Sequence, residues 1–478
     1  MQWRFSHLVG VVAAMSFVLT GWSTTSAAKS STARFAAFSA LSHPAAGGTL
    51  PLPRRNGVTL TVATVNNDNM VTMQSLTSKF TQQTGINVKY VTLPEDQLRS
   101  KVTTDVATGA GKFDIVTIGT YDAPIWGKNR WAVPFQPLFN QLPAATRSAY
   151  NLSDIFPSIR NALSYKGQLY AVPFYGESSM LYYRTDLFKA NHITLPLHPT
   201  WSQVAAAAKK LNSSSVHGIC LRGLPGWGEV LAPLDTVINT FGGRWYDLKW
   251  NAQLTSPAVK NAVNFYVNLV RNYGEPGASG DGFTECETLL ATGKVAMWVD
   301  ATVAAGTLED PKKSLEAGKI GFAYAPIQKT PKGSHWLWAW SLAVEGASKN
   351  KAAAAEFITW ATSGQYLNLV GSTNGWVNVP PGTRVSTYKN GNYLKAAGSF
   401  ANIVKASILS ANQHNATLLP VPYVGIQYVD IPEFQGFGES ISNLISAAIA
   451  GRMSVNSALA QAQKLAQDAA VKGGYKKK

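Results

Sequence analysis

Alternating strand and helix patterns between residues 58 and 118 restrict the folds open to this chain. Apolar residues recur with a period of two in three short segments, and at helical spacing in the two segments between them. These patterns predict strands at 58–64, 86–90 and 113–118 and helices around 73–80 and 98–106. This order is typical of a parallel sheet with helices on both faces, so the predicted fold class is α/β. Ligands bind such sheets beyond the carboxyl ends of the strands.

The loops that follow the first and third strands are therefore candidate binding segments. The first loop carries Asn66 and Asp68, whose amide and carboxylate could contact a ligand. The same two side chains could instead cap a turn or the helix that follows. The third strand leads into Gly119, Thr120 and Tyr121, where the glycine would let a ligand approach the backbone closely.

The length of the chain requires more than one hydrophobic core. With 478 residues it exceeds what one core usually organises, and two lobes are expected. A second α/β unit is predicted from helices at 201–211 and 257–273 and a strand at 295–300. Asp300 ends that strand and is a candidate hydrogen-bond acceptor for a ligand.

The first residues have the pattern of a secretory signal. Arg4 precedes an apolar run at 8–19, and small residues at 26–28 suit cleavage, so 1–28 is predicted as a signal peptide. Residues 29–56 are rich in Ala, Ser, Pro and Gly and are expected to form a disordered leader. No later segment is long and apolar enough to span a bilayer, and no Cys near the cleavage site would carry a lipid anchor. The chain is therefore expected to be exported, soluble and periplasmic.

The net charge of +16 does not by itself indicate nucleic-acid binding. The basic residues are scattered, and their only run is Lys476–Lys478, so no nucleic-acid partner is expected. Two cysteines, Cys220 and Cys286, form no disulfide framework, and the sequence leaves open a single bridge or two buried thiols. The histidines are scattered and the common metal, phosphate and nucleophile motifs are missing, so neither a metal nor a cofactor is expected.

The segment 169–188 changes from an apolar strand pattern to a row of polar residues. After Pro173 it places Tyr175, Glu177 and Ser178 close together. An aromatic ring, a carboxylate and hydroxyls suit a small, hydroxyl-rich ligand. Packing or an ion pair at a hinge is the alternative role for these residues. The segment returns to a strand and then a helix, which predicts that the polar cluster lies where the chain passes between its two units.

Tryptophans recur among polar and glycine-rich residues. Alternation between 335 and 344 places Trp336, Trp338 and Trp340 on one face of a strand, and Trp245 and Trp376 lie in loops. These rings could cover the apolar face of a ligand. Because tryptophan is more often a core residue, two or three ligand contacts at most are expected.

Motifs along nearly the whole chain together resemble the extracellular solute-binding proteins of carbohydrate ABC transporters, in the group that includes maltose-binding protein. The similarity is strongest to the sorbitol/mannitol (polyol) binding members. Among the matching segments are TVNN (64–67), VPFYGESSM (172–180), AMWVDATVAA (296–305), WLWAWSLAV (336–344), GWVNVPPGTR (375–384) and VPYVGIQYVDIPEFQG (421–436).

The resemblance implies a type II periplasmic-binding-protein fold, with two discontinuous α/β lobes around a hinged ligand cleft. The three crossings between the lobes would fall near 173–176, 338–341 and 374–379. The implied domains are lobe I at 57–173 plus 340–375, lobe II at 174–339 plus 376–470, and a basic tail at 471–478.

The resemblance also implies ligand contacts from later segments. Arg222 and Trp227 lie on a loop that the family uses from its second lobe. Arg222 suits bidentate contact with neighbouring hydroxyls, but a structural ion pair is an equal alternative. Glu433 and Phe434 resemble an aromatic-bearing segment that faces sugar in the family.

The implied function is an exported receptor that captures a linear polyol and delivers it, as a monomer, to the permease subunits of an ABC importer. It would not be an enzyme. A cyclic mono- or disaccharide is the alternative ligand, and a glycosidase using Glu177 and Asp300 is a further alternative. A surface adhesin would need repeats that the sequence lacks. If Glu177 accepts a charge-assisted hydrogen bond, Glu177→Gln should weaken binding by about one to two orders of magnitude.

Overall fold

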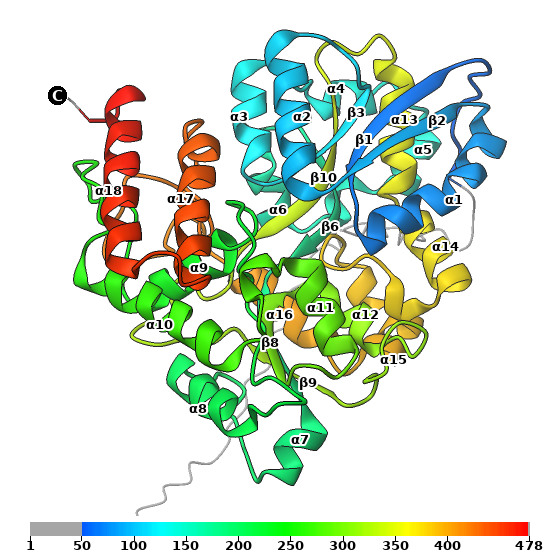
Figure 1. The fold of residues 1–478 in the computed structure, drawn as a ribbon. Helices are drawn as coiled ribbons and strands as arrows, with labels where there is room; N and C mark the ends of the chain where they lie inside the picture. The colour runs from blue at the N-terminus through cyan, green and yellow to red at the C-terminus, as the bar shows by residue number, and fades with distance from the viewer. Residues whose placement is uncertain (1–49, 477–478) are drawn as a thin grey trace, which may run out of the picture. The chain divides into compact units, whose positions relative to one another are not determined.

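The computed structural model describes residues 50–476 (Figure 1). The predicted signal peptide at 1–28 and most of the predicted leader at 29–56 lie outside these residues, as do the last two residues of the tail. Within 50–476, none of the helices combines the length and the apolar character needed to cross a membrane.

A five-stranded sheet in the order β2-β1-β3-β10-β6 forms the centre of the first lobe. Its strands are β1 (Thr59–Val65), β2 (Asn87–Leu93), β3 (Ile115–Ile118), β6 (Val172–Glu177) and β10 (Trp338–Val344). β1 pairs in parallel with β2 and β3, which confirms the parallel start predicted from the sequence. β10 is antiparallel to both β3 and β6, so the late strand lies between two strands from early in the chain. All residues of β3, β6 and β10 are buried, because both faces of the sheet are covered.

The helices of this lobe begin and end at residues with clear local causes. α1 (Asp68–Thr84) begins after Asn67, whose side chain accepts a hydrogen bond from the backbone N–H of Met70. It ends at Gly85, and α2 (Glu95–Thr108) ends at Gly109, and each of these glycines has a positive φ. The other helices of this lobe are α3 (Asp122–Asn129), α4 (Phe135–Phe139), α5 (Ala144–Tyr150), α6 (Pro157–Ala162), α13 (Lys351–Ala361) and α14 (Gly364–Asn374), and β4 (Ser164–Tyr165) pairs with β5 (Gln168–Leu169).

A three-stranded antiparallel sheet in the order β8-β7-β9 forms the centre of the second lobe. Its strands are β7 (Ser179–Arg184), β8 (Met297–Ala301) and β9 (Ile320–Tyr324). The predicted helix at 201–211 is present with a capping box between Thr200 and Gln203. The helices of this lobe are α7 (Thr185–Ala190), α8 (Trp201–Leu211), α9 (Leu231–Thr240), α10 (Pro257–Tyr273), α11 (Phe283–Ala291), α12 (Ala305–Glu309), α15 (Gly391–Ala397), α16 (Ala401–Ser410), α17 (Phe434–Ile449) and α18 (Val455–Lys472).

Short 3₁₀ helices mark several of the connections. They are η1 (Leu152–Asp154), η2 (Ala278–Gly280), η3 (Thr302–Ala304), η4 (Trp376–Asn378) and η5 (Thr387–Lys389).

The chain passes between the two sheets more than once. β6 of the first sheet continues through the single residue Ser178 into β7 of the second sheet. The chain returns from β9 to β10 through residues 325–337. These passages make both lobes discontinuous in sequence, whereas the residue boundaries of the lobes given above stay a prediction.

Candidate ligand-binding site

A cavity of about 300 Å³ lies beside the carboxyl ends of β1 and β2. The segments after these strands line one side of it, and second-lobe residues 222–229 and 283–285 line the other. Residues from the crossing segments complete the wall. The lining residues are Val65, Asn66, Asn67, Pro94, Glu95, Arg99, Glu177, Arg222, Leu224, Trp227, Gly228, Glu229, Ala232, Phe283, Thr284, Glu285, Val303, Trp336, Trp338, Trp340 and Gln427.

Several residues proposed from the sequence come together in this cavity. They are Asn66, Glu177, Arg222, Trp227, Trp338 and Trp340. Glu177 and Trp338 meet there because they are direct neighbours across the β6–β10 pair. Trp336 lines the cavity with Trp338 and Trp340, as the alternation predicts.

A second group of proposed residues packs behind the wall rather than lining it. The Tyr121 hydroxyl donates to the carbonyl oxygen of Ile431 at 3.0 Å, and its ring centroid lies 4.9 Å from that of Trp227. Phe434 is fully buried, and its ring centroid lies 5.7 Å from that of Trp227. The indole N–H of Trp245 donates to Asp235. Tyr121 and Phe434 thus pack against Trp227, and Trp245 packs against Phe434 with 5.4 Å between the ring centroids.

Thr120, Tyr175 and Ser178 are buried and form hydrogen bonds to residues far away in sequence. The Thr120 hydroxyl donates to the carbonyl oxygen of Leu337 at 3.1 Å. The Tyr175 hydroxyl accepts a hydrogen bond from the Asn67 side chain at 2.9 Å, and the backbone N–H of Ser178 donates to Thr302. In this arrangement they fix the crossing segments.

Three further proposed residues lie away from the cavity lining. Asp68 forms an exposed ion pair with Lys313 at 2.8 Å, which joins α1 to the second lobe. Trp376 begins η4 and covers Gly371. Glu433 accepts a hydrogen bond from the Tyr475 hydroxyl at 3.1 Å. Direct ligand contact by any of the residues outside the lining stays a prediction.

Arg222 is held by a network of acceptors on the second lobe. Its Nε and Nη2 donate to the two carboxylate oxygens of Asp300 at 2.8 and 2.6 Å. Its Nη1 donates to the carbonyl oxygen of Gly228 and to Glu229. Asp300 is fully buried and also accepts from the indole of Trp298. The geometry gives Asp300 the role of orienting Arg222, which presents its guanidinium at the cavity.

Glu95 and Arg99 form a second charged group, which was not among the residues predicted from the sequence. Arg99 Nη2 lies 2.7 Å from the carboxylate of Glu95, one helical turn earlier. Its guanidinium carbon lies 4.1 Å from the ring centroid of Trp227, 4.8 Å from Trp338 and 4.9 Å from Trp340. Trp227 belongs to the second-lobe loop, so Arg99 links the two sides of the cavity.

A sequence signal for this pair was present in the loop after the second strand. The strand-end rule applies to that loop as it does to its neighbours, and Glu95 and Arg99 follow it directly. Asn67 does not stand out from its neighbours Asn66 and Asp68, because all three residue types are typical helix caps. Glu229 lies in the loop that already supplied Arg222 and Trp227. Gln427 had no local signal, since it lies in an irregular segment far along the chain.

Carboxylates outnumber guanidiniums around the cavity. Glu95, Glu177, Glu229 and Glu285 face Arg99 and Arg222. Burial raises the pKa of Glu177 to about 8, with Arg222 opposing this shift and Asp300 adding to it. Burial likewise raises the pKa of Glu229 to about 8 against the effect of Arg222. Below a pH of about 8, Glu177 and Glu229 are largely protonated, while Arg99 and Arg222 pair with Glu95 and Asp300. An anionic ligand would therefore meet guanidiniums that already have partners, whereas an uncharged one would find both acceptors and donors.

We expect the effect of Glu177→Gln on binding to depend strongly on pH. At pH 6 the carboxyl, with a pKa of about 8, is protonated and glutamine is a close isostere, so the dissociation constant should change by less than about threefold. At pH 9.5 the wild-type carboxylate can accept charge-assisted hydrogen bonds, and the variant should bind about tenfold or more weakly than wild type. Calorimetric titration of both proteins at the two pH values measures this ratio.

A matched control for this prediction is Glu316→Gln, since Glu316 pairs with Arg184 and Lys319 away from the cavity. Its affinity relative to wild type should be the same at both pH values. An affinity ratio for Glu177→Gln that does not change with pH would contradict the prediction.

The comparisons with known proteins agree with this architecture. Residues 63–366 match the family model of the bacterial extracellular solute-binding proteins. The chain is 46% identical to the mannitol-binding protein of Pseudomonas aeruginosa, over 90% of this chain and 97% of that protein.

Two solved structures extend the comparison. A solute-binding protein from Agrobacterium vitis S4 with bound D-mannitol is 49% identical, with a TM-score of 0.84 over 87% of this chain and 99% of that chain. One from Agrobacterium radiobacter K84 in complex with ribitol is 25% identical, with a TM-score of 0.76 over 87% of this chain and 99% of that chain. The fold is therefore the predicted type II arrangement of two discontinuous α/β lobes. The chain belongs to the family of bacterial extracellular solute-binding proteins.

Proposed function

We propose that this protein is the receptor of an ABC importer and captures a linear polyol of the mannitol type in the cavity between its lobes. Two proteins that are similar to nearly the whole chain support this proposal. One is a mannitol-binding protein, and the other is a solute-binding protein whose structure contains bound D-mannitol. The ribitol complex adds a second acyclic polyol at lower identity.

The observation that carries the proposal is the composition of the cavity wall. Buried carboxylates accept hydrogen bonds, Arg99 and Arg222 donate them, and indole faces can cover the C–H groups of a carbon chain. A linear polyol has a hydroxyl on every carbon and no charge, so each of these groups has a partner. A phosphate would bring its negative charge to a lining in which both guanidiniums already pair with carboxyl groups.

The same geometry does not favour the glycosidase alternative. Asp300, the second carboxylate of that hypothesis, is fully buried and both of its oxygens accept from Arg222. It therefore cannot flank a scissile bond together with Glu177 without breaking that pair. The expected role is capture and release of an unchanged ligand.

The family role supports three further parts of the proposal. The protein would work outside the cytoplasmic membrane after export, deliver its ligand to permease subunits, and act as a monomer. A surface on each lobe would contact the permease in the closed state.

The test is a calorimetric titration of the purified protein with D-mannitol, sorbitol, ribitol, glucose, maltose and mannitol 1-phosphate. We expect saturable binding of the linear polyols with a dissociation constant of about 1 µM or lower, and no binding of the phosphate ester. Binding of the cyclic sugars alone would replace the polyol by the cyclic alternative. No binding across the panel, or consumption of a ligand, would contradict the receptor proposal.

A further inference from the structure

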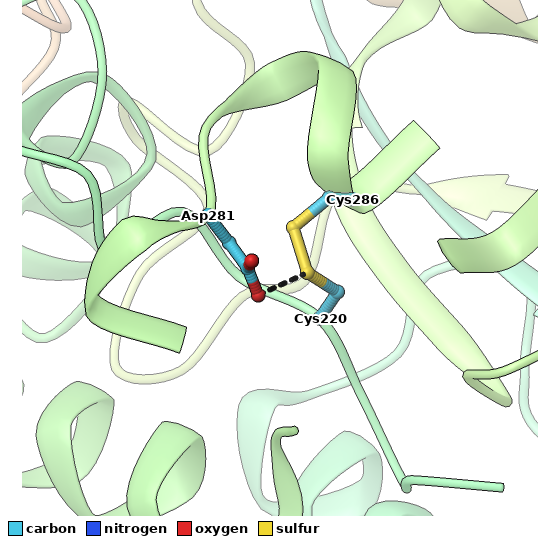
Figure 2. A group of neighbouring side chains, drawn as sticks. All are labelled: Cys220, Asp281 and Cys286. Atoms are coloured by element: carbon cyan, nitrogen blue, oxygen red, sulfur yellow. Dashed lines mark hydrogen bonds between the residues drawn. A yellow bond between two sulfur atoms is a disulfide. The ribbon is translucent and has the colours of Figure 1, made fainter. Parts of the chain in front are cut away.

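A buried disulfide lies directly behind the second-lobe wall of the cavity. Cys220 and Cys286 are bonded, with Cα atoms 5.5 Å apart and a sequence separation of 66 residues (Figure 2). Both side chains are at most 2% exposed. The bond decides the question that the sequence left open in favour of a bridge. Asp281 completes a group whose potential metal-ligating atoms lie within 4.8 Å of one another, but two of these atoms are the bonded sulfurs and not free thiolates.

Each of the bonded cysteines lies next to one of the two segments that form this wall. Cys220 precedes segment 222–229, and Cys286 follows segment 283–285. Arg222 follows Cys220 by two residues, and Glu285 immediately precedes Cys286 in the first turn of α11. Both Arg222 and Glu285 line the cavity. The cavity-lining residues of both segments therefore lie within ten positions of a bonded cysteine.

Noncovalent contacts also join the two segments. The backbone N–H groups of Gly223 and Leu224 donate to the carbonyl oxygen of Asp281 at 2.8 and 2.9 Å. The N–H of Phe283 donates to the carboxylate of Glu229 at 3.3 Å. The guanidinium carbon of Arg222 also lies 5.3 Å from the ring centroid of Phe283. If the sulfurs were not joined, these contacts and the Arg222–Asp300 pair would have to hold the two segments in register.

We propose that Cys220 and Cys286 are positioning residues for ligand binding. Their bond fixes segments 222–229 and 283–285 in the arrangement that binds the ligand. Without it the wall samples other arrangements, and binding must then order it at a cost in affinity. This inference rests on the proposed polyol function for its affinity readout, but not for its readout of backbone order.

The first test compares the full-length wild type with Cys220→Ala/Cys286→Ala. We expect the variant to bind D-mannitol about tenfold more weakly, mainly through faster dissociation. In the ligand-free variant the amides of Gly223, Leu224 and Phe283 should exchange with solvent faster, while those of α18 should be unchanged. Equal affinity within about twofold, together with equal exchange at these amides, would overturn the proposal.

A second experiment keeps the test valid if the variant does not fold. Wild type is reduced with dithiothreitol. The reagent supplies two electrons and two protons, so the protein S–S bond breaks to two thiols while dithiothreitol is oxidised to its cyclic disulfide. Thiol counting confirms the reduction, and oxidised glutathione restores the bond. Weaker binding and faster local exchange that both reverse on reoxidation support the proposal, and their absence overturns it.

The two proposals fail in different ways. If oxidised wild type binds no polyol, the proposed function fails, and the exchange measurement still decides the role of the disulfide. If oxidised wild type binds mannitol and loss of the bond changes neither affinity nor exchange, only the positioning role fails.

Discussion

Arg222→Ala is expected to abolish measurable ligand binding and to lower the free energy of unfolding by about 3–5 kcal/mol. The stability loss follows because the change leaves Asp300 buried with its two strongest donors removed. The binding loss follows because the cavity loses a guanidinium donor and the loop at Gly228 loses its anchor. Urea unfolding followed by circular dichroism measures the first effect, and calorimetric titration with D-mannitol measures the second.

A double variant separates the two effects of Arg222. Arg222→Leu/Asp300→Leu removes both charges, so most of the stability should return, since a buried pair replaced by apolar residues costs little. Binding should not return. Lys319→Ala breaks an exposed ion pair with Glu316 and should change stability by less than about 1 kcal/mol. If the free energy of unfolding of Arg222→Ala were within about 1 kcal/mol of the wild-type value, the pair with Arg222 would not be needed to stabilise the buried Asp300.

Gly119→Ala is expected to lower the free energy of unfolding by about 1–3 kcal/mol and to weaken ligand binding by about tenfold or more. An added Cβ at this position would overlap the indole ring of Trp338, which lines the cavity. The ring is buried and packs against Trp227, Trp340 and Tyr428, so these rings oppose its displacement. Unfolding and titration of the variant measure both effects.

Gly436→Ala is the matched control for Gly119→Ala. Gly436 lies in α17, is exposed, and has nothing within 4 Å of an added Cβ. Alanine there should leave binding unchanged and stability equal or slightly higher, because alanine favours helix. If Gly119→Ala behaved like this control, Trp338 would not need its observed position.

Local signals in the sequence predicted much of the fold. Gly85 ends a helix with a left-handed conformation, and Thr200 caps another through its side chain, each within one turn of the residues that it controls. The insertion of β10 between β3 and β6 was not predictable in the same way. Strand neighbours are chosen by packing between segments far apart in sequence, and periodicity within one segment carries no information on that choice.

The residues of the candidate site likewise fall into those with a local sequence signal and those placed by long-range packing. Glu177 and Arg222 were recognisable because their residue types stand out within short polar segments. Arg99 reaches the cavity only because one face of α2 packs beside Trp227 of the other lobe, which no local pattern specifies. Asp300 was correctly placed at a strand end, but the sequence could not tell a ligand acceptor from the partner that orients Arg222.

The position of β10 also sets an order for folding during synthesis. The central pairing partner of both β3 and β6 begins at Trp338, so β6 has no neighbour in the first sheet until more than two thirds of the chain has been made. Until then β3 and β6 expose unpaired backbone edges, and within the first sheet only β1, β2 and β3 can pair. The strands of the second sheet all precede β10, so that sheet can form before the first one is complete. Completion of the first sheet is therefore expected to be a late step that depends on long-range pairing.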